Sequence, residues 1–199
     1  MSPDNAPERD ALDLDSRSIL PAEWLALRER HPRAGWQADS RLGMTAQFWL
    51  ERHDAFRRLA AALQQMTGRF RGGGLDPEDF SAGFAPRLQL LLSELNGHHQ
   101  VEDFHYFPLF RRAEPRLVPG FALLDRDHKT LHLSLVETAE AANALLQALA
   151  RAPAEAEGPA ETYAEVSGLL LTRMARHLDD EEDLVIPLLI ERGEDGLMP

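Results

Sequence analysis

Four long stretches of the sequence place apolar residues at alternating steps of three and four, and this pattern limits the fold more than any other feature. Such spacing gathers apolar side chains on one face of an α-helix, where they can be buried. No stretch shows the strict alternation of a β-strand. We therefore expect an all-α protein, an up-down-up-down four-helix bundle. Its helices should cover residues 41–67, 76–109, 121–151 and 160–192.

The first 40 residues are expected to lie outside this bundle. Residues 1–18 are acidic, contain two prolines and have little to bury, so they are expected to form a mobile tail. Residues 21–32 are expected to form a short helix that opens at Pro21 and stops before Pro32. The chain is accordingly divided into an N-terminal tail with a short helix over 1–40 and a bundle over 41–199.

Composition limits the chemistry that the bundle can carry. The chain has no cysteine, which excludes disulfides, thiolate zinc sites and iron–sulfur clusters, so any metal must be held by nitrogen and oxygen. A net charge of -12 argues against nucleic acid or an anionic membrane as a partner. No signal peptide and no membrane-spanning run is recognisable, and we expect a cytoplasmic protein.

A repeated motif supplies candidate ligands. His98-x3-Glu102-x5-Pro108 recurs as His177-x3-Glu181-x5-Pro187. Each copy follows a helix that bears an inward-facing histidine early in its length. Because short loops make consecutive helices antiparallel, the early part of one helix and the late part of the next lie at the same end. We therefore expect four histidines to meet at one level: His53, His98, His128 and His177.

Residues four apart share one face of a helix, so each glutamate can join its motif histidine, and His132 can join His128. Five imidazoles and two carboxylates are too many donors for one ion, but they suit two octahedral ions that share bridging carboxylates. Burying such groups among apolar side chains is costly unless a metal satisfies them. The expected metal ligands are His53, His98, Glu102, His128, His132, His177 and Glu181.

Other interpretations of single residues remain open at this stage. His99 and Asp103 also stand four apart and offer an alternative register for the second helix, although the pairing of Pro108 with Pro187 favours His98. A lone histidine such as His53 is more often a hydrogen-bonded core residue than a ligand. His31 is assigned to the surface.

Taken together, these residues resemble the hemerythrin-like, or HHE cation-binding, family over about residues 41–192. The resemblance implies a di-iron centre with an oxygen or hydroxide bridge. One iron would be held by His128, His132 and His177, the other by His53 and His98, with Glu102 and Glu181 bridging. In the invertebrate oxygen carriers the last carboxylate is an aspartate five residues after its histidine. Here Glu181 follows after four, and Glu182 stands at the fifth place.

The resemblance implies a protein that binds dioxygen or nitric oxide for sensing, storage or transport; the sequence indicates no protein partner. The alternatives are a di-iron enzyme that reduces peroxide or nitric oxide, an iron donor for cluster repair, and a structural zinc site. Zinc is disfavoured because its structural sites prefer four ligands, mostly thiolates. His105, three residues after Glu102, is expected on the inward face, where it would hydrogen-bond a bridging glutamate or close an open coordination position.

Overall fold

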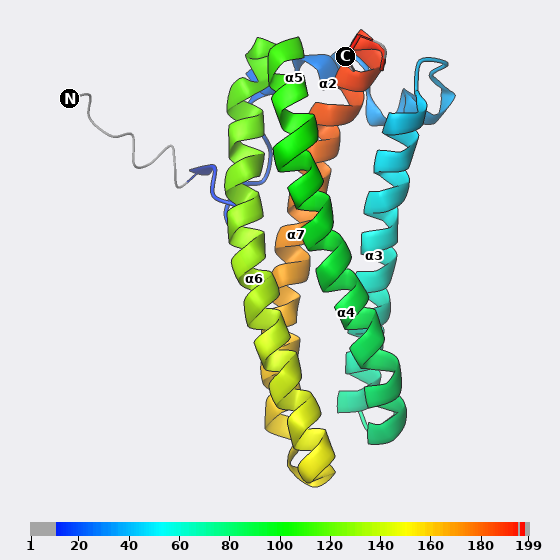
Figure 1. The fold of residues 1–199 in the computed structure, drawn as a ribbon, viewed down its shortest axis with the longest axis vertical. Helices are drawn as coiled ribbons and strands as arrows, with labels where there is room; N and C mark the ends of the chain where they lie inside the picture. Colours follow the sequence, from blue (N-terminus) through cyan, green and yellow to red (C-terminus); the bar gives the residue numbers. More distant parts are fainter. Residues whose placement is uncertain (1–10, 195, 198–199) are drawn as a thin grey trace, which may run out of the picture. The chain divides into compact units, whose positions relative to one another are not determined.

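The computed structural model describes residues 11–194 and 196–197, and this part of the chain is an all-α helical bundle without strands (Figure 1). The predicted fold class is therefore confirmed. Among the described helices, none is both long and apolar enough to cross a membrane. The long helices are α3 (Met44–Arg71), α4 (Pro77–Val101), α6 (Val118–Arg151) and α7 (Glu157–Arg192). The shorter elements are η1 (Ala22–Trp24), α2 (Ala26–Arg30), η2 (Arg33–Ala38), η3 (Glu102–Tyr106), α5 (Phe107–Ala113), η4 (Pro115–Leu117) and η5 (Pro153–Glu155).

The turn between α3 and α4 follows from its residues. Gly73 has a φ of 71°, in the left-handed region that glycine adopts at least cost, and this ends α3. Asp76 then caps α4, because its Oδ1 accepts a hydrogen bond of 2.8 Å from the backbone N–H of Glu78. The predicted start of this helix is thus the observed one.

The described chain divides into two compact units. Unit 1 contains the described residues of Met1–Arg52, Val101–His128 and Ala175–Pro199. Unit 2 contains His53–Gln100 and Lys129–Met174. The four long helices each contribute residues to both units.

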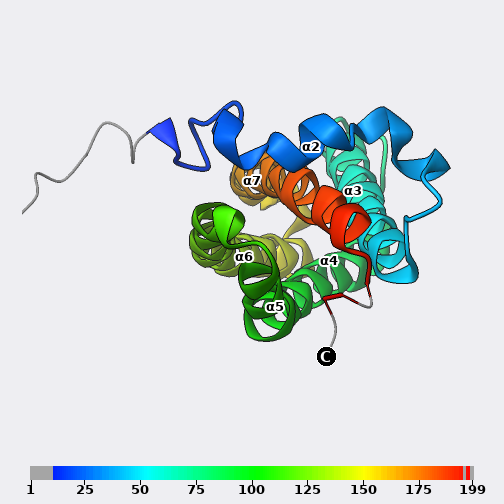
Figure 2. The same cartoon turned by 90° about the horizontal axis from the view of Figure 1, so that it is seen from above.

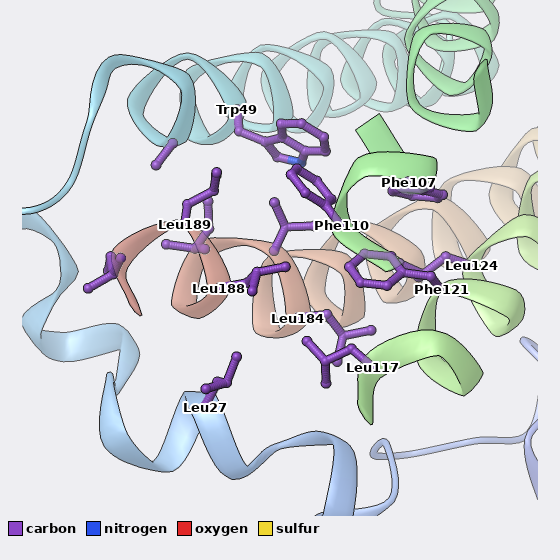
Figure 3. Close-up of a cluster of buried hydrophobic side chains, with 14 of the residues drawn as sticks. Leu27, Trp49, Phe107, Phe110, Leu117, Phe121, Leu124, Leu184, Leu188 and Leu189 are labelled. Atoms are coloured by element: carbon purple, nitrogen blue, oxygen red, sulfur yellow. The ribbon is translucent and has the colours of Figure 1, made fainter. Parts of the chain in front are cut away.

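Unit 1 has a core in which one stretch of α7 is buried on all sides. Every residue from Leu184 to Ile190 is buried, and aromatic side chains of α5 and α6 pack against this stretch (Figure 3). A helix that faces solvent on one side could not tolerate such a continuous apolar run. The outer side is covered by the segment before α3, which runs alongside α7 (Figure 2). This segment contributes Leu20, Leu25, Leu27, Trp36 and Leu42 to the core.

Ion pairs connect the same N-terminal segment with α7. The guanidinium groups of this segment donate hydrogen bonds to carboxylates on the polar side of the helix. His31, which the sequence assigns to the surface, is half-buried and takes part as well, with Nε2 2.6 Å from Oε2 of Glu191. The arginine pairs are Arg28 with Asp183, Arg30 with Glu191, and Arg33 with both Glu182 and Asp183.

The predicted mobile tail differs from the structure where it is described. Residues 1–10 lie outside the described residues, but Leu14 and Arg17 are buried. The Arg17 guanidinium donates to both carboxylate oxygens of Asp127 and, at 2.7 Å, to Oδ2 of Asp180. The expectation that this segment has little to bury is wrong, because two carboxylates inside unit 1 compensate the arginine charge.

The end of α4 also departs from the expected register. Residues Glu102–Tyr106 form a π-helix, in which backbone hydrogen bonds join residues five apart and not four apart as in an α-helix. The buried positions therefore shift from Glu102 to Phe107 and Phe110, and His105 becomes exposed. The prediction that His105 faces inward is wrong for this reason.

Replacing Arg17 by methionine should lower the free energy of unfolding by about 3–5 kcal/mol, because Asp127 and Asp180 would lose a buried cation. Urea denaturation measures this. Arg58→Met is the matched control: Arg58 pairs with Asp54 on the exposed side of α3, and its loss should change stability by no more than about 0.5 kcal/mol. Equal effects of the two substitutions would contradict the role given to Arg17.

Candidate metal centre

Four of the predicted ligands come together within unit 1. Glu102 lies on η3, His128 on α6, and His177 and Glu181 one turn apart on α7. One nitrogen or oxygen of each lies within 4.8 Å of one such atom of every other. None of the four residues is more than 4% exposed. Two imidazoles and two carboxylates therefore share a small buried space.

The donor atoms within this group face one another. Nε2 of His128 lies 3.1 Å from Nε2 of His177 and 3.5 Å from Oε2 of Glu102. Nε2 of His177 lies 3.2 Å from Oε2 of Glu181. Imidazole nitrogens and carboxylate oxygens, with no sulfur among them, can bind iron, manganese or zinc. The chemistry of the donor set thus fits a metal cation.

The outer nitrogens of both histidines are directed at further carboxylates. Nδ1 of His128 lies 2.7 Å from Oδ1 of Asp103, and Nδ1 of His177 lies 3.6 Å from Oδ2 of Asp127. The distance at His128 is that of a hydrogen bond, and a bond from Nδ1–H to a carboxylate leaves Nε2 with its lone pair available to a metal. The longer distance at His177 is that of an ion pair. Since Asp127 also accepts from Arg17, the N-terminal segment is connected to the group through this aspartate.

The structure separates the roles of the two neighbouring glutamates. Glu181 is fully buried, and its Oε1 accepts a hydrogen bond of 2.5 Å from Nε1–H of Trp49. Glu182 instead pairs with Arg33 at 2.7 Å. The geometry therefore favours Glu181 as the ligand. Sequence reasoning placed Trp49 only in an apolar layer; its position four residues before His53, on one helix face, was the signal that it lies near the site.

Burial and charge shift the protonation of this group. Burial, together with the charge of Glu181, raises the pKa of Glu102 well above its usual value. Burial lowers the pKa of His177, but Asp127 and Glu181 outweigh this effect and raise it to about 9. Burial lowers the pKa of His128. Without a cation, protons must offset the negative charge of the two glutamates, and a bound cation would replace them.

Two further predicted ligands meet within unit 2. Nε2 of His53 lies 3.1 Å from Nε2 of His98, with the two rings edge to face at 5.1 Å. His53 is fully buried, and Phe56 packs against the ring of His98 at 5.2 Å. His99 is buried as well, whereas its partner in the alternative register, Asp103, contacts Nδ1 of His128. His98 is thus directed at His53, as the favoured register requires, while the assignment of His98 as the ligand stays a prediction from the sequence.

His132 is placed differently from the other predicted ligands. It is exposed and lines an open groove of unit 2, of about 520 Å³, beside Asn96 and Leu135. The buried leucines of α6 near it are Leu131 and Leu135, so His132 lies beside the buried face of the helix and not on it. Its role as a ligand stays a prediction from the sequence.

Replacing Glu102 by glutamine should flatten the pH dependence of the metal-free protein. The raised pKa of Glu102 means that the folded state holds a proton after the unfolded chain has lost it, so stability falls as pH rises above about 4.5. The raised pKa of His177 adds a second fall from about 6.5 to about 9, which the variant shares. Urea denaturation from pH 5 to 8 should show the variant at least as stable as the parent at neutral pH, yet less stabilised by added metal.

The matched control is Glu165→Gln on the exposed face of α7, which should follow the parent at every pH, with and without metal. If Glu102→Gln destabilised the metal-free protein and left the effect of metal unchanged, Glu102 would be a structural residue and not a ligand.

The comparisons with known proteins identify a cation-binding family. A family model described as hemerythrin HHE cation binding domain matches residues 44–189. Searches of curated proteins and of solved structures gave no match. The matched region contains every residue of the two histidine and glutamate groups described above. Because the match covers more than half of the sequence, the chain belongs to the hemerythrin HHE cation-binding domain family.

Proposed function

We propose that this chain is a non-haem di-iron protein that binds dioxygen or nitric oxide for sensing, storage or transport. The observation that carries the proposal is the buried group of unit 1, in which two imidazole nitrogens and two carboxylates face one another. The chain has no cysteine thiolate to offer, so the site favours metals that accept nitrogen and oxygen. The family match supports cation binding by this region.

Two ions are proposed because of the number and kind of donors. Glutamate carboxylates have two oxygens and can bridge a pair of ions, as Glu102 and Glu181 would do. His128 and His177 would bind one iron, and the sequence adds His132 to it. The resemblance assigns His53 and His98 to the other iron, and their Nε2 atoms face each other in unit 2.

An iron pair would supply the redox-active centre to which a diatomic molecule binds. The protein residues around it hold the ligands and exclude water. Trp49 fixes Glu181 by a hydrogen bond, and Phe107 stacks on the ring of His128 at 5.4 Å. Both aromatic residues belong to the apolar core of unit 1. Such surroundings favour a small neutral ligand over an ion, because a buried charge would need its own partner.

The direct test is anaerobic loading of the purified chain with ferrous iron. We expect about two irons per chain, and a change in the visible spectrum when dioxygen or nitric oxide is added. His128→Ala should remove at least one iron.

The control is His105→Ala, which replaces a histidine on the exposed side of η3 and should keep both irons and the spectral change. Full iron content in His128→Ala, or no response to either gas, would refute the proposal, and sustained turnover of peroxide would favour the enzymatic alternative.

Asp103→Asn should weaken iron binding about 10–100-fold, because the amide accepts the Nδ1–H bond of His128 less strongly than a carboxylate does. Competition with a chelator measures the affinity. Asp54→Asn, at an exposed position of α3, is the matched control and should bind iron as the parent does. Equal affinities for all three proteins would show that Asp103 does not act on the ligand.

A further inference from the structure

Unit 2 contains a cavity that the proposed metal site does not use. Its volume is about 190 Å³, and residues from α3, α4, α6 and α7 line it. The lining includes none of the predicted metal ligands. Its apolar wall is formed mainly by Leu63, Leu88, Leu91, Leu170 and Leu171.

Two buried hydroxyl groups lie in this apolar wall. Thr67 on α3 is 5% exposed and Thr138 on α6 is fully buried, and the hydroxyl oxygen of neither has a hydrogen-bond partner. Other threonines of the chain behave differently: Thr162 and Thr172 donate to the carbonyl four residues earlier. A buried hydroxyl without a partner destabilises the folded state, because it has lost its hydrogen bond to water. The two hydroxyls therefore belong to residues that line the cavity, and each has a hydrogen-bonding capacity that no described residue uses.

The remaining polar groups indicate a neutral occupant. Burial raises the pKa of Tyr163 to about 12, so this part of the lining is an uncharged phenol. Arg71 is the one charged residue among the described residues that line the cavity. Its guanidinium pairs with Glu161, and both side chains are largely in solvent. No charge inside the cavity would compensate a buried anion or cation.

The volume sets the size of the occupant. It is somewhat larger than an apolar cavity of about 150 Å³ that takes up benzene, and far larger than the space of about 10–15 Å³ that one water needs. Leucine side chains suit an apolar body, and a threonine hydroxyl of the lining can bond a polar group. We propose that this cavity binds a small neutral molecule with an apolar ring or short chain and one hydroxyl group, of the class of a simple phenol.

The test is a calorimetric titration of the full chain with phenol, with benzene as the comparison ligand. We expect one phenol per chain. Thr138→Val keeps the shape of the side chain and removes the hydroxyl, so it should weaken phenol binding about 3–10-fold and leave benzene binding unchanged. Phenol binding that is insensitive to this substitution would overturn the proposal, as would the failure of phenol to bind.

A second variant tests the location of the ligand. A side chain at Gly168, which lines the cavity, would meet no atom within 4 Å at its Cβ, so Gly168→Leu should fold normally and fill the space. Phenol binding should then be lost. Gly158→Leu also places a leucine in α7 without a clash, but away from the cavity, and should bind phenol as the parent does. Phenol binding retained in Gly168→Leu would place the ligand elsewhere and refute the assignment.

Discussion

The burial of two glutamates beside two histidines is the constraint on which the rest of unit 1 depends. Glu102 and Glu181 are almost without solvent contact, and burial together with the charge of Glu181 raises the pKa of Glu102. A fold that buries such a pair loses stability at neutral pH unless a cation takes the place of protons. The residues that lower the stability of the metal-free bundle would therefore stabilise the metal-bound one. Folding stability and metal binding would thus depend on the same side chains.

The groups around this set explain why the N-terminal segment packs against the bundle. Arg17 compensates Asp127, which in turn faces Nδ1 of His177. Farther along, leucines and a tryptophan of the same segment cover the apolar run of α7 from Leu184 to Ile190. The segment thus contributes both a charge near the metal ligands and the apolar cover that lets α7 be buried on all sides. Its removal would expose the core and change the surroundings of His177 together.

The sequence predicted the helices and the burial of most of the candidate ligands, because the period and the spacing of residues are local properties of the chain. The motif spacing placed Glu102, His177 and Glu181 correctly on helix faces that are buried. Features that depend on distant partners were not predictable: a buried Arg17 needs two aspartates more than 100 residues away. The exposure of His105 follows from a π-helix, for which the sequence has no simple periodic signature. The exposure of His132 likewise depends on which face of α6 packs into the core of unit 2, and the sequence alone does not determine this.

The most direct test of the proposed centre is X-ray absorption at the iron edge of the loaded protein. Our account predicts coordination by nitrogen and oxygen only, scattering from several imidazole rings, and a second iron as a near neighbour of the first. His177→Ala should reduce the imidazole scattering, since Nε2 of His177 faces Nε2 of His128 and Oε2 of Glu181. An isolated iron, or iron without imidazole scattering, would contradict the account.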